Sequence, residues 1–287
     1  MTPALYGLMT AFGWGGADFI ARFTGRAMGH EVALFAMLTV GALLFGLIVW
    51  LGGLPLAWDW SGAWLLVSSG VAIMVATLLL YWGLARGPVT LVAPLVGAYP
   101  ALNVLLELSL GARPSALQWI AMGVVMAGVI VVARAANAFE DEAEFSRAAL
   151  RKTTIIALAS AVGFAVAVAA AQHAAQIYGE LQTVVMGRWV SLAAILLWLL
   201  FRRRRPVVPL RWWPLVVLQG LLDAGAYVAL LSAGTGEGGA VAVVVASCFA
   251  AVTVVLARVV LKEAMTYAQW GGIAAIIAGV ATLSAQG

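Results

Sequence analysis

Residues 110–134 read LGARPSALQWIAMGVVMAGVIVVAR, and residues 261–285 read LKEAMTYAQWGGIAAIIAGVATLSA. Each stretch begins with a polar turn and continues into an apolar run of about 20 residues, the length that an α-helix needs to cross a bilayer. Both stretches carry Gln-Trp at the start of the run, as Gln118-Trp119 and Gln269-Trp270. The two stretches therefore predict a membrane-spanning helix that occurs twice in one chain.

The composition of the whole chain agrees with a membrane location. Of 287 residues, 64% are hydrophobic and 10% are charged, and the mean hydropathy is +1.04. A soluble protein carries about 25% charged residues, so this chain has too few charges to cover a globule with a polar surface. Its single cysteine, Cys248, excludes an intrachain disulfide scaffold.

The apolar runs predict an all-α integral membrane protein with ten transmembrane helices. Each run is about 20 to 25 residues long, and Gly- and Pro-containing turns separate the runs. They cover Pro3–Thr24, Glu31–Leu51, Ser61–Ala85, Pro88–Leu110, Pro114–Arg134, Thr153–Ala175, Leu181–Phe201, Trp212–Ser232, Gly238–Leu261 and Thr266–Ala285.

The chain divides into two similar halves. Residues 1–134 and 153–287 each hold five runs, and the polar residues 135–152 between them are expected to form a solvated cytoplasmic linker rather than a partner site. Gly128-Val129 matches Gly279-Val280 at the same offset as the Gln-Trp pairs. Because five is an odd number, the second half enters the membrane from the opposite face, so the sequence predicts two inverted-topology five-helix repeats.

Basic residues outside the runs predict the orientation. With ten spans, Arg113 alone lies on one side, and twelve basic residues lie on the other, which the positive-inside rule makes cytoplasmic. Both termini are then expected outside the cell. We interpret Arg202–Arg205 as a topology anchor rather than a nucleic-acid site, so no nucleic-acid partner is expected. The twelve are Arg26, Arg86, Arg134, Arg147, Arg151, Lys152, Arg202, Arg203, Arg204, Arg205, Arg211 and Lys262.

Two motifs resemble those of a known family. Trp14-Gly15-Gly16-Ala17-Asp18-Phe19 resembles its opening signature, and Leu261-Lys262-Glu263 with Gln269-Trp270 resembles its closing one. With ten helices in two repeats, the chain resembles the EamA type of the drug/metabolite transporter superfamily. The resemblance implies a cytoplasmic-membrane transporter, commonly an exporter of amino acids or other small metabolites, with a central cavity. In two departures, Gly111-Ala112 replaces Lys262-Glu263 in the first half, and many relatives place their termini in the cytoplasm.

Charged residues inside the runs are the first candidates for a functional site, because burying a charge in a membrane is costly. Asp18 is one helical turn from Arg22, which predicts either a local ion pair or a cavity carboxylate that binds a substrate amine or a proton. Asp223 has no basic residue within one turn. Arg188 is a candidate partner for Asp223 or an anion site, with outward snorkelling as the alternative. We expect Asp18, Arg188 and Asp223 to bind substrate or couple transport.

Other residues receive gating or cavity roles. Arg22, Glu107, Gln172, His173 and Arg258 lie toward helix ends, which predicts interface anchoring or gating. Prolines at 94 and 100 are expected to interrupt the fourth helix and free backbone groups for binding. The predicted cavity-lining residues are Trp14, Tyr81, Tyr99, Asn103 and Tyr227.

These features predict a secondary transporter that exports small metabolites by alternating access. No cofactor or metal is expected, because the sequence has no phosphate loop or Cys/His cluster, and the string Gly234-x-Gly236-x-x-Gly239 lacks the strand that a nucleotide fold needs. We therefore expect no enzyme. Two acids opposite one arginine fit a zwitterionic substrate, and a buried aspartate fits proton coupling. The alternative is a non-transporting membrane protein, such as a receptor or assembly subunit.

Overall fold

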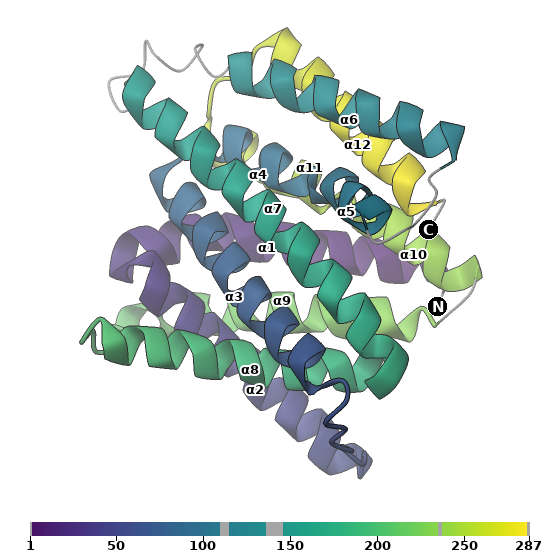
Figure 1. Cartoon of the computed structure of the whole chain (residues 1–287). Helices are drawn as coiled ribbons and strands as arrows, with labels where there is room; N and C mark the ends of the chain where they lie inside the picture. The colour runs from purple at the N-terminus through teal and green to yellow at the C-terminus, as the bar shows by residue number, and fades with distance from the viewer. Residues whose placement is uncertain (1, 110–114, 136–145, 235–236, 286–287) are drawn as a thin grey trace.

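The computed structural model describes residues 2–109, 115–135, 146–234 and 237–285, which fold as helices joined by short connections, with no strand in these ranges (Figure 1). Its helices are α1 (Pro3–Met28), α2 (His30–Gly52), α3 (Ala63–Arg86), α4 (Val89–Gly97), α5 (Tyr99–Ser109), α6 (Ala116–Ala135), α7 (Arg147–Tyr178), α8 (Glu180–Phe201), α9 (Trp213–Ser232), α10 (Glu237–Ala246), α11 (Phe249–Leu256) and α12 (Tyr267–Ser284), with short helical turns η2 (Leu210–Trp212) and η3 (Ala257–Leu261).

The elements form ten spans, as predicted. Two spans are built from consecutive pieces: α4 with α5, and α10 with α11 and η3. In the described part of the chain, nine spans are long and apolar enough to cross a membrane by length and composition. The tenth is α1, which packs against α2, α3, α9, α10 and α11. Its glycines and Asp18 make it less apolar than the others, which suits a helix inside the bundle.

Both broken spans bend at equivalent positions. Ala98 separates α4 from α5 with φ −79° and ψ −1°, and Cys248 precedes α11 with φ −75° and ψ 2°. Prolines 94 and 100 predicted the first break. The second break has no proline and was missed, because it comes from the repeated architecture rather than from a local helix breaker.

Hydrogen bonds between helices repeat across the two halves. The Thr10 hydroxyl of α1 donates to the Ala226 carbonyl of α9 at 3.1 Å, and the Ser160 hydroxyl of α7 donates to the Ala76 carbonyl of α3 at 2.8 Å. The donors Thr10 and Ser160 are equivalent positions of the two repeats, and so are the acceptors Ala226 and Ala76, so donor and acceptor have exchanged repeats. The two halves therefore use one packing scheme twice.

The contact between α6 and α12 has the reciprocity of a twofold axis. A Cβ on Gly128 would lie 2.7 Å from the Gly272 carbonyl oxygen and 2.8 Å from Ile276. A Cβ on Gly279 would lie 2.9 Å from the Ala121 carbonyl oxygen and 2.5 Å from Val125. Gly128 and Gly279 are equivalent positions of the two repeats, and the residues that they meet are equivalent as well. This is the pattern of a symmetric interface. The chain is an inverted-repeat bundle.

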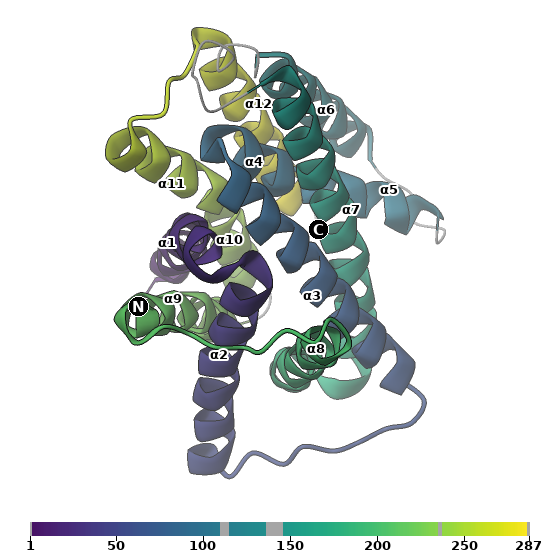
Figure 2. The same cartoon turned by 90° about the vertical axis from the view of Figure 1, so that its left-hand side faces the viewer.

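The repeats depart from symmetry at the two ends of the bundle. We call the end with Arg26, Arg86 and Arg202–Arg205 the basic end, and the opposite end, where both chain termini lie in Figure 1, the terminal end. Toward the basic end, α4 packs on α11 and α1 on α3. The symmetry-related pairs toward the terminal end, α5 with α10 and α7 with α9, make no comparable contact among the described residues. Figure 2 shows α4 next to α11, whereas α5 lies well away from α10.

The linker between the repeats is only partly described. Residues 136–145, with its acidic run, lie outside the described residues. The sequence predicted a solvated linker up to residue 152, but α7 already begins at Arg147. The Ser146 hydroxyl caps α7 by accepting a hydrogen bond from the Ala149 amide.

Candidate functional site

An ion pair lies at the centre of the candidate site. The Arg188 guanidinium of α8 is 2.6 Å from the Asp223 carboxylate of α9, with side chains 7% and 16% exposed. Arg188 also lies over the rings of Phe45 at 5.7 Å and Tyr227 at 5.3 Å. The alternative of Arg188 snorkelling toward an interface is wrong, because its side chain is held between helices. Asp223 has no basic residue within one turn on α9, and its partner Arg188 lies on α8.

Asp18 lies on α1, one turn after Trp14, whose ring packs against Tyr227. Its side chain is half-buried and lies within electrostatic range of Asp223. The local ion pair with Arg22, one of the two alternatives that the sequence left open, is not formed among the described residues, and Arg22 forms an ion pair with Glu263. The described part of the structure records no hydrogen bond or ion pair to the Asp18 carboxylate.

Aromatic side chains surround the three charges. Trp14 is one turn before Asp18 on α1, and its ring packs edge-on against Tyr227 at 5.0 Å and against Phe249 at 6.1 Å. The Tyr227 hydroxyl lies within electrostatic range of Asp18, Asp223, Arg188 and Tyr99. Residues from α1, α8, α9 and α11 therefore meet in one place.

A buried hydrogen-bond chain continues from the site toward the basic end. The Gln219 amide donates to the Tyr81 hydroxyl at 2.7 Å, and the Thr24 hydroxyl donates to the Gln219 amide oxygen at 2.9 Å. All three side chains are buried, and Tyr81 is within electrostatic range of Asp18, Asp223 and Arg188. Gln219 and Thr24 were missed in the sequence, although a glutamine one turn before Asp223 in an apolar helix was a usable signal.

Asn103 is the least connected of the predicted cavity residues. It lies one turn after Tyr99 on α5, and its amide oxygen is buried with no hydrogen-bond partner in the described part of the chain. The ring of Tyr99 packs against Phe164 of α7 at 5.8 Å. Asn103 therefore offers an unused acceptor in the half of the molecule where α5 and α10 are apart.

A second polar contact joins the repeats at the basic end. Arg22 lies 3.5 Å from Glu263, and both side chains are buried. The Glu263 carboxylate also accepts hydrogen bonds from the backbone amides of Val89 and Thr90, at 3.0 and 2.9 Å, and from the Thr90 hydroxyl at 2.8 Å. A carboxylate at the first turn of α4 interacts favourably with the helix dipole. One side chain thus holds α1, α4 and the segment before α12 together.

The other predicted gating residues lie away from the central charges. Arg258 donates to the Glu263 carbonyl at 2.9 Å, so it supports the Arg22–Glu263 contact. His173 contacts the Ala169 carbonyl of its own helix at 2.8 Å, and Gln172 is exposed. Glu107 lies on α5, but its side chain is outside the described residues, as are Arg113 and residues 235–236. The gating roles of these residues stay predictions.

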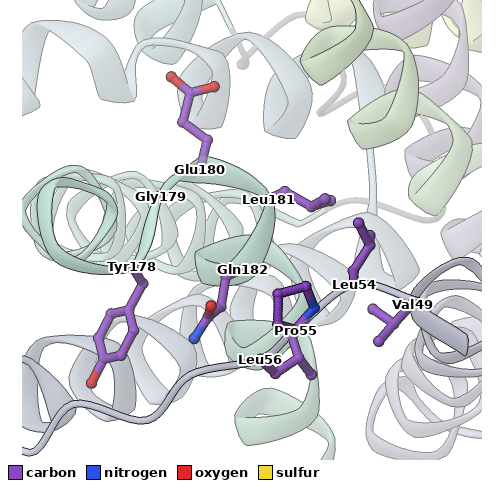
Figure 3. A pocket seen from close by; sticks show the side chains of 9 residues that line it. All are labelled: Val49, Leu54, Pro55, Leu56, Tyr178, Gly179, Glu180, Leu181 and Gln182. Atoms are coloured by element: carbon purple, nitrogen blue, oxygen red, sulfur yellow. The ribbon is translucent and has the colours of Figure 1, made fainter. Parts of the chain in front are cut away.

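Two pockets lie at the terminal end. One, of about 270 Å³, sits between the end of α2 and the turn from α7 to α8 (Figure 3). In Figure 3 the Glu180 carboxylate points away from the other lining residues, and Gln182 is bound to the Ala57 backbone. This pocket therefore presents few free polar groups. The other, of about 370 Å³, is lined in part by Phe45, whose ring also contacts Arg188.

No group of three or more metal-ligating side chains occurs among the described residues. The chemistry that the central site offers is instead ionic and aromatic: one ion pair, one further carboxylate and several rings. Such a site suits noncovalent recognition of a small polar molecule.

Comparisons with known proteins agree with the fold. One solved structure, described only as a crystal structure of a protein, has a TM-score of 0.67 with this chain at 17% sequence identity, and the match covers 98% of this chain and 96% of the other. At this identity the likeness shows the fold alone. No curated protein matches the sequence. The model of the EamA-like transporter family matches twice, at residues 1–134 and 151–285. The chain therefore belongs to the EamA-like transporter family.

Proposed function

We propose that the protein is a secondary transporter that moves a small metabolite out of the cytoplasm by alternating access. The basic end faces the cytoplasm under the positive-inside rule, and both termini then lie outside. The membrane is the cytoplasmic membrane, and the Asp18, Arg188 and Asp223 cluster is the substrate site. In this orientation the end where α4 packs on α11 faces the cytoplasm, and the end where α5 and α10 are apart faces outward.

The observation that carries the proposal is the unequal packing of otherwise equivalent helices. The repeats share their packing within the bundle, but α4 contacts α11 at the basic end while α5 and α10 stay apart at the terminal end. Two repeats with one architecture can exchange these arrangements, which would open the basic end and close the terminal end around a fixed central site. A static scaffold has no use for this difference.

The Arg22–Glu263 contact is the proposed cytoplasmic gate. Glu263 bonds to the amino end of α4, and α4 must move away from α11 for the basic end to open. The equivalent turn in the first repeat has Gly111-Ala112 in place of Lys262-Glu263, so no second carboxylate gate is built into the sequence. The proposed gate therefore favours the outward-open state.

Energy for net movement would come from the substrate gradient or from protons that bind a central carboxylate. The substrate class expected from the sequence was a zwitterion such as an amino acid. That expectation requires Arg188 to bind the substrate carboxylate, but in this state the Arg188 guanidinium is paired with the Asp223 carboxylate. A zwitterion would have to open the ion pair.

Flux into proteoliposomes tests the proposal. Purified protein is reconstituted, and uptake or release of amines, amino acids and organic acids is measured with and without a pH gradient. Saturable flux of at least one class, lost in Asp18→Asn, is expected. No flux above protein-free liposomes for any class would favour the alternative of a receptor or assembly subunit.

A further inference from the structure

The central site carries one carboxyl group more than its internal pairing uses. Arg188 and Asp223 neutralise each other at 2.6 Å. Asp18 lies one turn after Trp14 on α1 and within electrostatic range of Asp223, and the described part of the structure records no ion pair to its carboxylate. An ionised carboxylate without a partner is costly in a low-dielectric interior, so the charged form of Asp18 calls for a positive counter-charge.

The surroundings of Asp18 suit an organic cation better than a bare metal ion. A metal ion needs several oxygen ligands, and no cluster of three acidic, His or Cys side chains occurs in the described ranges. Aromatic faces attract ammonium groups instead. Trp14 contacts Tyr227 and Phe249, with ring centroids 5.0 and 6.1 Å apart, and it shares the face of α1 that carries Asp18.

Arg188 has little freedom to bind an anionic group. Besides Asp223, it contacts the rings of Phe45 and Tyr227, and its guanidinium is 3.6 Å from where a Cβ on Gly41 would stand. A substrate carboxylate would compete with Asp223 for a cation that is already enclosed. A substrate ammonium would find Asp18 unoccupied.

We propose that the Asp18 site binds organic monocations, such as amines with an apolar body, in preference to zwitterions, with Asp18 as the counter-ion and Trp14 and Tyr227 as aromatic walls. The inference rests on the proposed function, because it names the substrate class of that central site.

The test uses four probes with one aromatic body and different charges: 2-phenylethylamine, phenylalanine, 3-phenylpropionate and 2-phenylethanol. Binding to the detergent-purified full chain is measured by calorimetry at neutral pH. We expect the amine to bind about tenfold or more tightly than the other three, as a desolvated ionic and cation–π contact implies. Equal or tighter binding of phenylalanine would overturn the proposal, and so would no binding of the amine.

Variants assign the effect to Asp18. Asp18→Asn is nearly isosteric and should weaken amine binding about tenfold or more while leaving 2-phenylethanol unchanged. Asp18→Glu keeps the charge and should retain amine preference, and Asp59→Asn, on the exposed loop after α2, serves as the matched control. Unchanged amine binding in Asp18→Asn would overturn the assignment.

The binding assay does not depend on transport. If the amine binds through Asp18 but no flux is found, the proposed transport function is refuted and the proposed amine site is supported. If phenylalanine is transported and outcompetes the amine, the proposed preference for organic monocations is refuted and the proposed transport function is supported.

Discussion

Arg22 of the first repeat and Glu263 of the second form a buried ion pair, with 3.5 Å between guanidinium nitrogen and carboxylate oxygen. The same carboxylate binds the first amides of α4, so the pair links one broken span to the central helix α1. The guanidinium lies over Gly87, where a Cβ would be 2.2 Å from it, and Gly87 has φ +71°. Glycine at position 87 allows both the close approach of the Arg22 guanidinium and the positive φ.

Glu263→Gln should weaken the closed basic end. The amide keeps an acceptor oxygen but removes the negative charge beside Arg22, and breaking a buried pair costs about 3 to 5 kcal/mol. We expect a lower denaturation midpoint in detergent. Glu180→Gln changes an exposed carboxylate at the terminal end and is the control. Equal midpoints for Glu263→Gln and the wild type would show that the pair contributes nothing.

Gly128→Ala should disrupt the contact between α6 and α12. The new Cβ would lie 2.7 Å from a backbone oxygen, so the helices must separate, at about 1 to 3 kcal/mol. Gly123→Ala on the same helix meets nothing within 4 Å and should be neutral or stabilise by up to about 1 kcal/mol. Thermal unfolding of both variants checks this. A Gly123→Ala variant as unstable as Gly128→Ala would contradict the assigned packing.

Arg188→Gln should destabilise the protein more than the loss of one contact suggests. It leaves Asp223 as an unpaired charge between helices, which should lower the free energy of unfolding by about 3 to 5 kcal/mol. Adding Asp223→Asn should restore most of the loss, because the double variant leaves neither charge of the pair without its partner. The control is Arg202→Gln, which removes a half-exposed partner of Glu31 at 4.0 Å and should cost less than about 1 kcal/mol. Additive effects of the two central substitutions would mean that the pair is not coupled.

The sequence predicted the architecture because its signals are local. Each span is recorded in the length of an apolar run, and the repeat is recorded in matching glycines such as Gly128 and Gly279. The charges Asp18, Arg188 and Asp223 were identifiable because a charge inside an apolar run is rare. The structure brings these three together.

Pairings between helices were harder to predict. Arg22 has an acid one turn away, which suggested Asp18, but its partner Glu263 is at the other end of the sequence. The Thr24, Gln219 and Tyr81 chain likewise joins three helices. Such contacts depend on how helices are rotated against each other, and no spacing within one helix encodes that rotation.

Alternating access is most directly tested by labelling from the two sides of the membrane. In a Cys248→Ser background, single cysteines replace Asn103 of α5, in the terminal half, and Leu91 of α4, buried in the basic half. A membrane-impermeant thiol reagent is applied to vesicles of either orientation, with the wild-type or the Glu263→Gln gate.

With the wild-type gate we expect labelling of position 103 from the terminal side and protection of position 91. With Glu263→Gln we expect position 91 to become reactive from the basic side while position 103 becomes protected, because opening one end must close the other. If position 91 becomes reactive without any fall at position 103, or if neither changes, the two ends are not coupled and the alternating-access account is wrong.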